Sequence, residues 1–384
     1  MPRQTLSLTG AAALAALLLF SPVRSALAEF TPSGRLEIHY INVGQGGCTL
    51  IIGPNGTRIL YDFGARSGNR QIVPYLRDEV GLEPSDGIDI AILSHRDTDH
   101  YLGYRDVVRS GFDVNVANFD SGSDKTSTTV RSHWLEPASK TPAGDVMPIP
   151  VGLRISLGDG AEAVVAAANG RLIDGTEIVV SNENDKSVVL FITYGDFQYI
   201  LDGDLGAGEE SCTNHDTGQM DVQSEVARAL LDEGLLPRDI GVDVMHVAHH
   251  GSESSTSAEY FDIVKPEVAL ISVGLNQRSF LHPRVDVVER VLLGPDRPNC
   301  VKAPAVKAVF QTEDGKTGCS STGCTSFAGI VAGDIKLTTD GRTGYAIVST
   351  GVADVAASGE TRDPVRVDRH FPFDESADLE DDPE

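Results

Sequence analysis

The sequence is poor in features that identify several common classes of protein. Its 384 residues include only 5 cysteines and 1 tryptophan, and 31 Lys and Arg residues stand against 56 Asp and Glu residues. No two cysteines have the CxxC spacing of a cysteine-zinc site. The formal net charge of −25 should repel nucleic acid and anionic membranes at long range, although it still allows a local positive site. No cluster of Lys and Arg is present that could follow a phosphate backbone, which argues against a basic nucleic-acid-binding domain.

Long apolar runs are also scarce. After residue 28, no stretch approaches the roughly 20 apolar residues that a membrane-spanning helix needs. Residues 1–28 differ from the rest, because Arg3, the apolar run GAAALAALLLF and the small residues of ALA at 26–28 are typical of a cleaved secretory signal peptide. An uncleaved anchor is the alternative. We therefore expect a secreted or periplasmic protein whose mature chain has no membrane span.

Short apolar runs that are typical of strands make up much of the chain. Residues 36–43 and 58–64 are strand-like, and 88–94 is a continuous apolar run of the kind found in strands buried on both faces. Amphipathic segments such as 224–234 predict helices between the strands. The pattern indicates an α/β fold, with helix-covered sheets, in one domain over residues 29–352.

The C-terminal part of the chain supports two further expectations. Cys300 lies in the same Gly/Ser/Thr-rich region as Cys319 and Cys324, so we expect it to form a disulfide with one of them after export. At least one of the 5 cysteines must stay unpaired within the chain. Residues 353–384 are charged and poor in apolar side chains, which predicts a disordered, acidic tail.

Side chains of metal-ligating types follow several predicted strands. Histidine nitrogens and carboxylate oxygens are the usual protein ligands of zinc, and carboxylates also suit manganese. Each residue alone has an ordinary explanation as part of a polar loop, a turn or a strand end. Together they predict a metal site at one edge of the sheets. The set consists of His95, Asp97, Asp99 and His100, directly after the strand at 88–94, with Asp62, Asp204, His249 and His250 at the ends of other predicted strands.

The segment SHRDTDHYLG resembles the His-x-His-x-Asp-His signature of the metallo-β-lactamase superfamily, with Asp97 in place of the second histidine. This variant is characteristic of the ComEC-type branch, the periplasmic nuclease-like domain of DNA-uptake proteins. Further segments resemble this branch between about residues 36 and 350: INVGQGGCTLI, ILYDFG, the strand pair ending at Asp204, and DVMHVAHHGS. The chain departs from the branch at Gly47, where the branch has an aspartate. It also reads NENDKS where the superfamily has a third-motif histidine.

The resemblance implies an αββα sandwich, in which two packed β-sheets carry helices on their outer faces and a dinuclear metal site at one edge. The implied ligands of the two ions, Zn²⁺ or Mn²⁺, are His95 and Asp97 for the first ion, Asp99, His100 and one of His249 and His250 for the second, and Asp204 as the bridge. Asp62 would support these ligands through hydrogen bonds. Glu183, Asn184 or Asp185 would replace the missing histidine, or the first ion would be weakly bound.

Such a site predicts hydrolysis by a metal-bridged hydroxide. Asp99 and His282 are the expected catalytic residues; His282 would protonate the leaving group or bind a phosphate, with helix capping as its structural alternative. The ComEC-type likeness favours a phosphodiesterase or nuclease, although the acidic charge does not favour DNA over a small-molecule substrate. The alternatives are a hydrolase of a small ester, lactone or lactam, and a non-catalytic metal-binding module. No sequence feature indicates the oligomeric state.

Overall fold

The structure is a computed structural model that describes residues 30–65, 69–209, 218–275, 277, 280–294, 297–321, 323–351 and 362–373. The expected signal peptide lies outside these residues. Within the described ranges, no helix has both the length and the apolar character that crossing a membrane requires.

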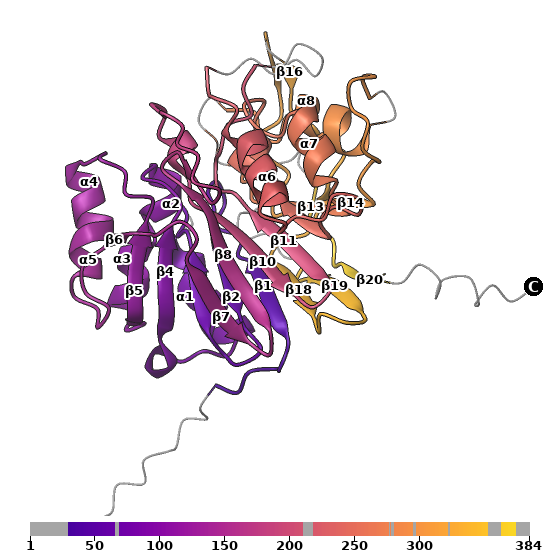
Figure 1. Ribbon diagram of the computed structural model, residues 1–384. Coiled ribbons are helices and arrows are strands. Elements are labelled where there is room, and N and C mark those ends of the chain that lie inside the picture. Colours follow the sequence, from indigo (N-terminus) through magenta and orange to yellow (C-terminus); the bar gives the residue numbers. More distant parts are fainter. Residues whose placement is uncertain are drawn as a thin grey trace, which may run out of the picture.

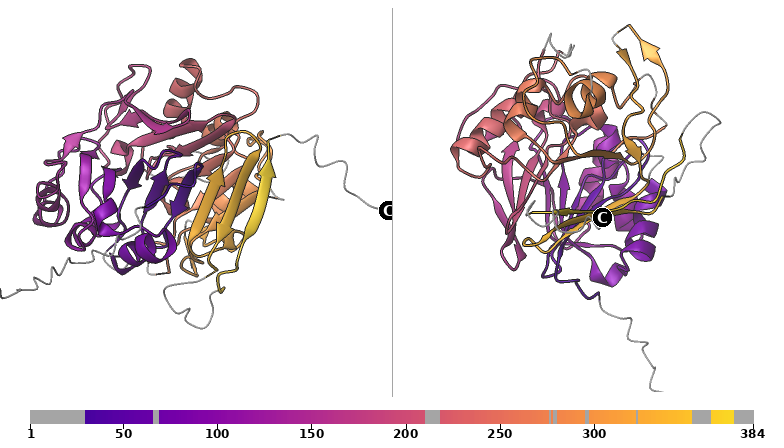
Figure 2. Two further views of the ribbon diagram at one scale, coloured as in Figure 1. Left: turned by 90° about the horizontal axis from the view of Figure 1, so that it is seen from below. Right: turned by 90° about the vertical axis from the view of Figure 1, so that its right-hand side faces the viewer.

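Two large sheets dominate the described part of the chain (Figure 1). The first is nine-stranded, in the order β20-β19-β18-β1-β2-β3-β4-β5-β6. Its strands are β1 (Leu36–Tyr40), β2 (Thr49–Ile52), β3 (Arg58–Tyr61), β4 (Ile88–Leu93), β5 (Val114–Asp120), β6 (Met147–Pro148), β18 (Ile335–Thr339), β19 (Gly344–Ser349) and β20 (Asp368–Pro372). Figure 2 shows the yellow C-terminal strands beside the indigo N-terminal ones, because β18 pairs antiparallel with β1.

The second sheet is also nine-stranded, in the order β17-β14-β13-β12-β11-β10-β8-β7, with β9 paired to β8. Its strands are β7 (Arg154–Gly158), β8 (Ala161–Ala168), β9 (Arg171–Leu172), β10 (Val189–Tyr194), β11 (Phe197–Leu201), β12 (Val244–His246), β13 (Val268–Ile271), β14 (Ala308–Gln311) and β17 (Ile330–Val331). The run β11-β12-β13-β14 is parallel, as is the run β3-β4-β5 in the first sheet. Parallel strands bring their carboxyl ends to one edge, which is where ligand sites form in such sheets.

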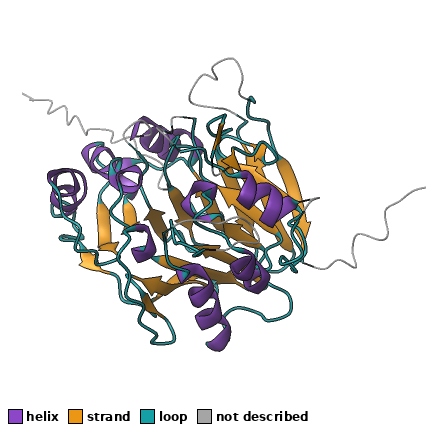
Figure 3. Ribbon diagram, turned by 90° about the horizontal axis from the view of Figure 1, so that it is seen from above, coloured by secondary structure: helices purple, strands orange, loops and turns teal. Residues whose placement is uncertain are grey.

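The main core lies between the two sheets, where Tyr40, Leu190, Tyr199 and Leu337 are fully buried. Separate apolar clusters join each sheet to the helices on its outer face (Figure 3). The first sheet carries α1 (Asn69–Pro74), α2 (Thr98–Tyr101), α3 (Tyr104–Arg109), α4 (Thr128–Val130) and α5 (Glu136–Ala138), and the second carries α6 (Val222–Asp232), α7 (Ala258–Val264) and α8 (Val285–Val287). Wider helical turns continue three of them, at Tyr75–Glu79, Arg131–Leu135 and Val288–Leu293. This confirms the predicted α/β sandwich of two helix-covered sheets.

The prediction of a disordered tail from residue 353 is wrong for residues 362–373. Strand β20 pairs antiparallel with β19 and extends the first sheet. Phe371 is 8% exposed and stacks on Tyr345 with ring centroids 4.8 Å apart. Residues 368–370 are charged and exposed, so their charge hides the strand in the sequence. The rest of the predicted tail lies outside the described residues.

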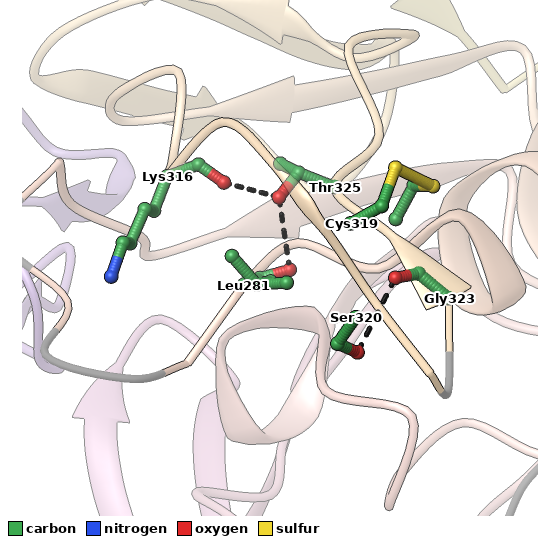
Figure 4. Close-up of a disulfide and its surroundings, with 7 residues drawn as sticks. Leu281, Lys316, Cys319, Ser320, Gly323 and Thr325 are labelled. Carbon is green, nitrogen blue, oxygen red and sulfur yellow. Dashed lines mark hydrogen bonds between the residues drawn. A yellow bond between two sulfur atoms is a disulfide. The ribbon is translucent and has the colours of Figure 1, made fainter.

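The predicted disulfide is also wrong, because Cys319 pairs with Cys324 and not with Cys300. Strands β15 (Cys319–Ser320) and β16 (Gly323–Cys324) form a small antiparallel ladder in which the two cysteines are direct partners. Thr325 then anchors the hairpin by donating its hydroxyl to the carbonyl oxygens of Leu281 and Lys316 (Figure 4). Of the described cysteines, Cys48 is a buried free thiol, as the odd cysteine count requires.

Candidate metal centre

The predicted metal-binding residues come together where strands of both sheets end. Asp62 follows β3, His95 follows β4, and Asp204 and His250 come after β11 and β12. The backbone at both His249 and His250 is left-handed, with φ of 52° and 56°. Non-glycine residues rarely adopt this conformation, and such strain is concentrated at functional sites. It turns the chain after β12 so that both rings face the carboxylates.

Three buried histidines converge on one oxygen of Asp204. The Nε2 atoms of His95, His100 and His250 lie 4.0, 3.2 and 3.5 Å from Asp204 Oδ2. Their side chains are at most 2% exposed, and each of these Nε2 atoms lacks a hydrogen-bond partner among the described residues. A buried polar nitrogen without a partner is costly and rare in folded proteins. Cations bound between the rings and the carboxylates would satisfy these nitrogens.

Hydrogen bonds on the opposite side of each ring set the tautomer. His250 Nδ1 lies 2.8 Å from the carbonyl oxygen of Ser272, which can only accept, so this nitrogen carries the proton. His100 Nδ1 lies 2.7 Å from Asp62 Oδ2, which leads to the same assignment. The hydroxyl of Ser94 donates to Asp62 and therefore accepts from His95 Nδ1 at 2.9 Å. All three rings thus present an Nε2 lone pair, the form that binds a metal ion.

The donor atoms form two overlapping groups. His95, His100 and Asp204 make one, and Asp99, His100 and His250 make the other, with the ligand atoms of each group within 4.8 Å of one another. Asp99 Oδ2 lies 3.5 Å from His250 Nε2. Nitrogen and carboxylate donors in this mixture fit Zn²⁺ and Mn²⁺ alike. The structure therefore fits the expected divalent ions without indicating which ion is native.

Asp97 lies beside this centre, with Oδ2 3.7 Å from His95 Nε2. Its other oxygen, Oδ1, forms an ion pair with the ammonium of Lys125. The side chain of Asp97 is 33% exposed, whereas that of His95 is fully buried. The position agrees with the expected role of Asp97 at the first ion, which stays a prediction. The reasoning from sequence missed Lys125, which lies in a Ser/Thr-rich loop without a recognisable motif.

Of the three candidates for the missing histidine, only Asn184 faces the centre. Its Nδ2 lies 3.3 Å from His249 Nε2. Glu183 instead accepts from the backbone nitrogen of Arg96 and from Ser123 Oγ, both at 2.8 Å. Asp185 accepts from the backbone nitrogens of Gly206 and Met220, at 3.2 Å each. Glu183 and Asp185 are thus committed to structural contacts.

The cluster is held by strong electrostatic coupling. Burial opposes ionisation of Asp204, but the neighbouring His100, His250 and His249 hold its pKa well below the usual range. Burial likewise lowers the pKa of His100, but Asp204 and Asp62 raise it well above the usual value. The carboxylates therefore stabilise positive charge at the centre. Burial and the neighbouring His249 and His250 keep the pKa of His282 well below its usual value, so His282 is neutral at pH 7.

A cavity of about 400 Å³ opens over the centre. Asp97, Asp99 and Asp204 line it beside the histidines, and His282 borders it with a buried Nδ1 that lacks a hydrogen-bond partner among the described residues. Its further lining residues include Lys125, Asn184 and Phe280. The centre is therefore accessible to a small molecule, as a catalytic site requires.

Comparisons with known proteins show what the chain is similar to. No protein-family model matches the chain. The chain is similar to Recombination protein 2 of Haemophilus influenzae, with 27% identity over 66% of this chain and 26% of that protein. It is similar to ComE operon protein 3 of Bacillus subtilis, with 24% identity over 66% of this chain and 30% of that protein. Among solved structures, the metallo-β-lactamase fold protein YhfI of Bacillus subtilis matches with a TM-score of 0.38 and 10% identity, over 61% of this chain and 85% of that chain.

The two helix-covered sheets, with the histidine and aspartate cluster at one edge, form the αββα sandwich of the metallo-β-lactamase fold. Within that fold, the similarity to the competence proteins confirms the resemblance to ComEC-type proteins that the motifs indicate. The chain spans about a quarter to a third of the length of these relatives. Fold and site together support a metal-dependent hydrolase.

Proposed function

We propose that this protein is an exported, metal-dependent phosphodiesterase. The observation that carries the proposal is the convergence on Asp204 of the Nε2 atoms of His95, His100 and His250, which have no hydrogen-bond partner in the described part of the chain. The signal-like residues 1–28 support export. The similarity to competence proteins supports a phosphate-containing substrate.

The residues have distinct proposed roles. His95, Asp97 and Asp204 would hold one ion, and Asp99, His100, His250 and Asp204 the other. Bound divalent ions supply an activated water at neutral pH and polarise a phosphoryl oxygen. Asp62 keeps the proton of His100 on Nδ1, away from the side that faces the ions. Neutral His282 borders the cavity and can donate its ring N–H to a phosphate oxygen or to the leaving oxygen.

A specific observation favours each of two alternatives. The acidic net charge of −25 is compatible with a hydrolase of small esters, lactones or lactams, which need no basic surface. Asn184 in place of a third-motif histidine is compatible with a binding module whose first metal site is weak. An ester hydrolase would cleave chromogenic esters or lactones and leave phosphodiesters intact. A binding module would take up substoichiometric metal and cleave neither.

The test is hydrolysis of bis(p-nitrophenyl) phosphate by protein that has been stripped of metal and reloaded with Zn²⁺ or Mn²⁺. We expect metal-dependent cleavage that is lost in Asp204→Ala. Asp196→Ala is the matched control, because Asp196 is exposed in the turn at the opposite end of β11. Stoichiometric metal binding without cleavage under either metal would reject the phosphodiesterase and favour the ester hydrolase.

A further inference from the structure

Lys125 is the only Lys or Arg among the described residues that line the metal cavity. Its ammonium pairs with Oδ1 of Asp97, while Oδ2 of the same carboxylate faces His95. The side chain of Lys125 is 42% exposed, so the ammonium is open to the cavity. An ammonium has three N–H donors, and the pair with Asp97 needs only one of them. The others can bind oxygens of an anion while Asp97 keeps both of its contacts.

The protein holds Lys125 in place through a buried arginine. Arg96, which is 9% exposed, donates from Nη1 to the carbonyl oxygen of Lys125 at 3.0 Å. Its Nε and Nη2 bind Asp120 Oδ2 at 3.0 and 2.8 Å. The indole of Trp134 donates to the same oxygen. Because the lysine backbone is anchored to these buried groups, little backbone freedom remains to be lost when a ligand binds.

The loop is fixed from its other side as well. Ser123 Oγ donates to Glu183 Oε2 at 2.8 Å and accepts from the backbone nitrogen of Lys125 at 3.2 Å. Lys186, a second lysine whose ammonium contacts this loop, is only 12% exposed and pairs with Asp124 and Glu183. Glu183, which resembles a substitute ligand in the sequence, therefore serves to place the lysine. The loop presents one available cation to the cavity, not a row of them.

An aromatic ring borders the same cavity. Phe280 is 55% exposed, although large apolar side chains are usually buried. It stacks on His282, with ring centroids 5.5 Å apart and an interplanar angle of 14°. Exposed aromatic rings next to a cationic group are the elements with which proteins bind nucleotides, by stacking on the base and pairing with the phosphate.

We propose that Lys125 binds a phosphate oxygen of the substrate and Phe280 stacks on its base, which makes the substrate a small nucleotide phosphodiester and not a long nucleic acid. This inference rests on the proposed phosphodiesterase function. One available cation in a cavity of about 400 Å³ matches one or two phosphates. A polymer would need further Lys and Arg residues along its path, and the chain carries a net charge of −25 instead.

The first experiment compares Lys125→Met, Lys125→Arg and the control Lys140→Met, which removes the same charge from an exposed position outside the cavity. Loss of a charge-assisted hydrogen bond should raise the KM for a dinucleotide, and the Kd for inorganic phosphate, about tenfold to a hundredfold in Lys125→Met. The arginine variant should recover most of this loss, and Lys140→Met should match the wild type. Metal content, measured by elemental analysis, should not fall in Lys125→Met.

Each arm can overturn a different part of the inference. Unchanged KM and phosphate affinity in Lys125→Met would refute the role of the lysine while leaving the phosphodiesterase intact. A fall in metal content would show that Lys125 acts by supporting Asp97. Phe280→Ala should raise KM for the dinucleotide and leave the affinity for inorganic phosphate unchanged; an unchanged KM would refute stacking. A long single-stranded oligonucleotide cleaved with a higher kcat/KM per bond than the dinucleotide would refute the small substrate.

If the wild-type protein cleaves no phosphodiester, the proposed phosphodiesterase function is refuted, and not the role of Lys125. The binding arm still decides the role of Lys125 in that case, because phosphate affinity is measured without turnover. Phosphate that binds the metal-loaded wild type and is lost in Lys125→Met would preserve an anion site. If phosphate binds neither the wild type nor Lys125→Met, the proposed anion site at Lys125 is refuted.

Discussion

Replacing Asp62 by asparagine should weaken metal binding without removing any atom that contacts the ion. Asp62 Oδ1 accepts from the backbone nitrogen of Ser94, and Oδ2 accepts from Ser94 Oγ and His100 Nδ1, all at 2.7 Å. An asparagine keeps the shape but must place an NH₂ group at one of these two positions. If the NH₂ group faces the backbone nitrogen of Ser94, two buried N–H donors point at each other and neither has an acceptor. Facing His100, the NH₂ group would force Nδ1 to accept and move the ring proton to Nε2, where the ion should bind.

Both outcomes weaken the site by the amount typical of lost support to a metal-binding histidine, about tenfold to a hundredfold in affinity, or about 1.4–2.7 kcal/mol. The assay is titration of the metal-stripped protein with Zn²⁺ in competition with a chromophoric chelator. Asp89→Asn is the matched control. Asp89 lies at the start of β4 and pairs with Arg58, whereas His95 follows the opposite end of that strand. Circular dichroism of both variants checks folding. Wild-type affinity in Asp62→Asn would refute the argument that Asp62 sets the tautomer of His100.

Two further predictions follow from the same geometry and from burial. His250→Ala should cost at least a hundredfold in Zn²⁺ affinity, because its buried Nε2 lies 3.5 Å from both Asp99 and Asp204. His249→Ala should cost about tenfold or less, because its Nε2 lies farther from Asp204, at 3.9 Å, and 3.3 Å from Asn184 Nδ2. Equal losses in the chelator assay would contradict this difference. Burial, with the repelling Glu267, raises the pKa of Asp243 to about 7. Between pH 4 and 7 the folded protein then binds a proton that the unfolded chain releases, so its stability should fall as pH rises through this range. Asp243→Asn should remove that fall and raise stability at pH 8 by about 1–3 kcal/mol in urea unfolding, and a pH dependence identical to wild type would count against it.

The sequence was informative where a single residue type and its place after a strand define the chemistry. The apolar run at 88–94 predicts β4, and the polar residues after it predict that His95, Asp99 and His100 lie at a sheet edge. Parallel strands then bring Asp204 and His250 to the same edge, because their carboxyl ends point one way. Such features depend on local pattern and topology alone.

Other features depend on contacts between distant segments, which a single sequence does not show. Choosing among Glu183, Asn184 and Asp185 requires knowing that backbone donors from elsewhere occupy Asp185, and that Arg96 and Ser123 occupy Glu183. The orientation of the two adjacent rings likewise depends on distant contacts, with Ser254 Oγ 2.6 Å from His249 Nδ1 and the Ser272 carbonyl oxygen 2.8 Å from His250 Nδ1. Strand β20 escapes prediction for a similar reason, since Phe371 is the one buried residue within the strand.

The added strand β20 has a practical consequence for handling the protein. A chain shortened to residue 352, where composition changes, would lose the partner of β19 along its whole length and uncover the ring of Tyr345. An open, apolar sheet edge recruits other chains, so the shortened protein should precipitate or associate during purification. Affinity tags and fluorescent labels are therefore best attached beyond residue 373, where they leave the ladder of the first sheet complete.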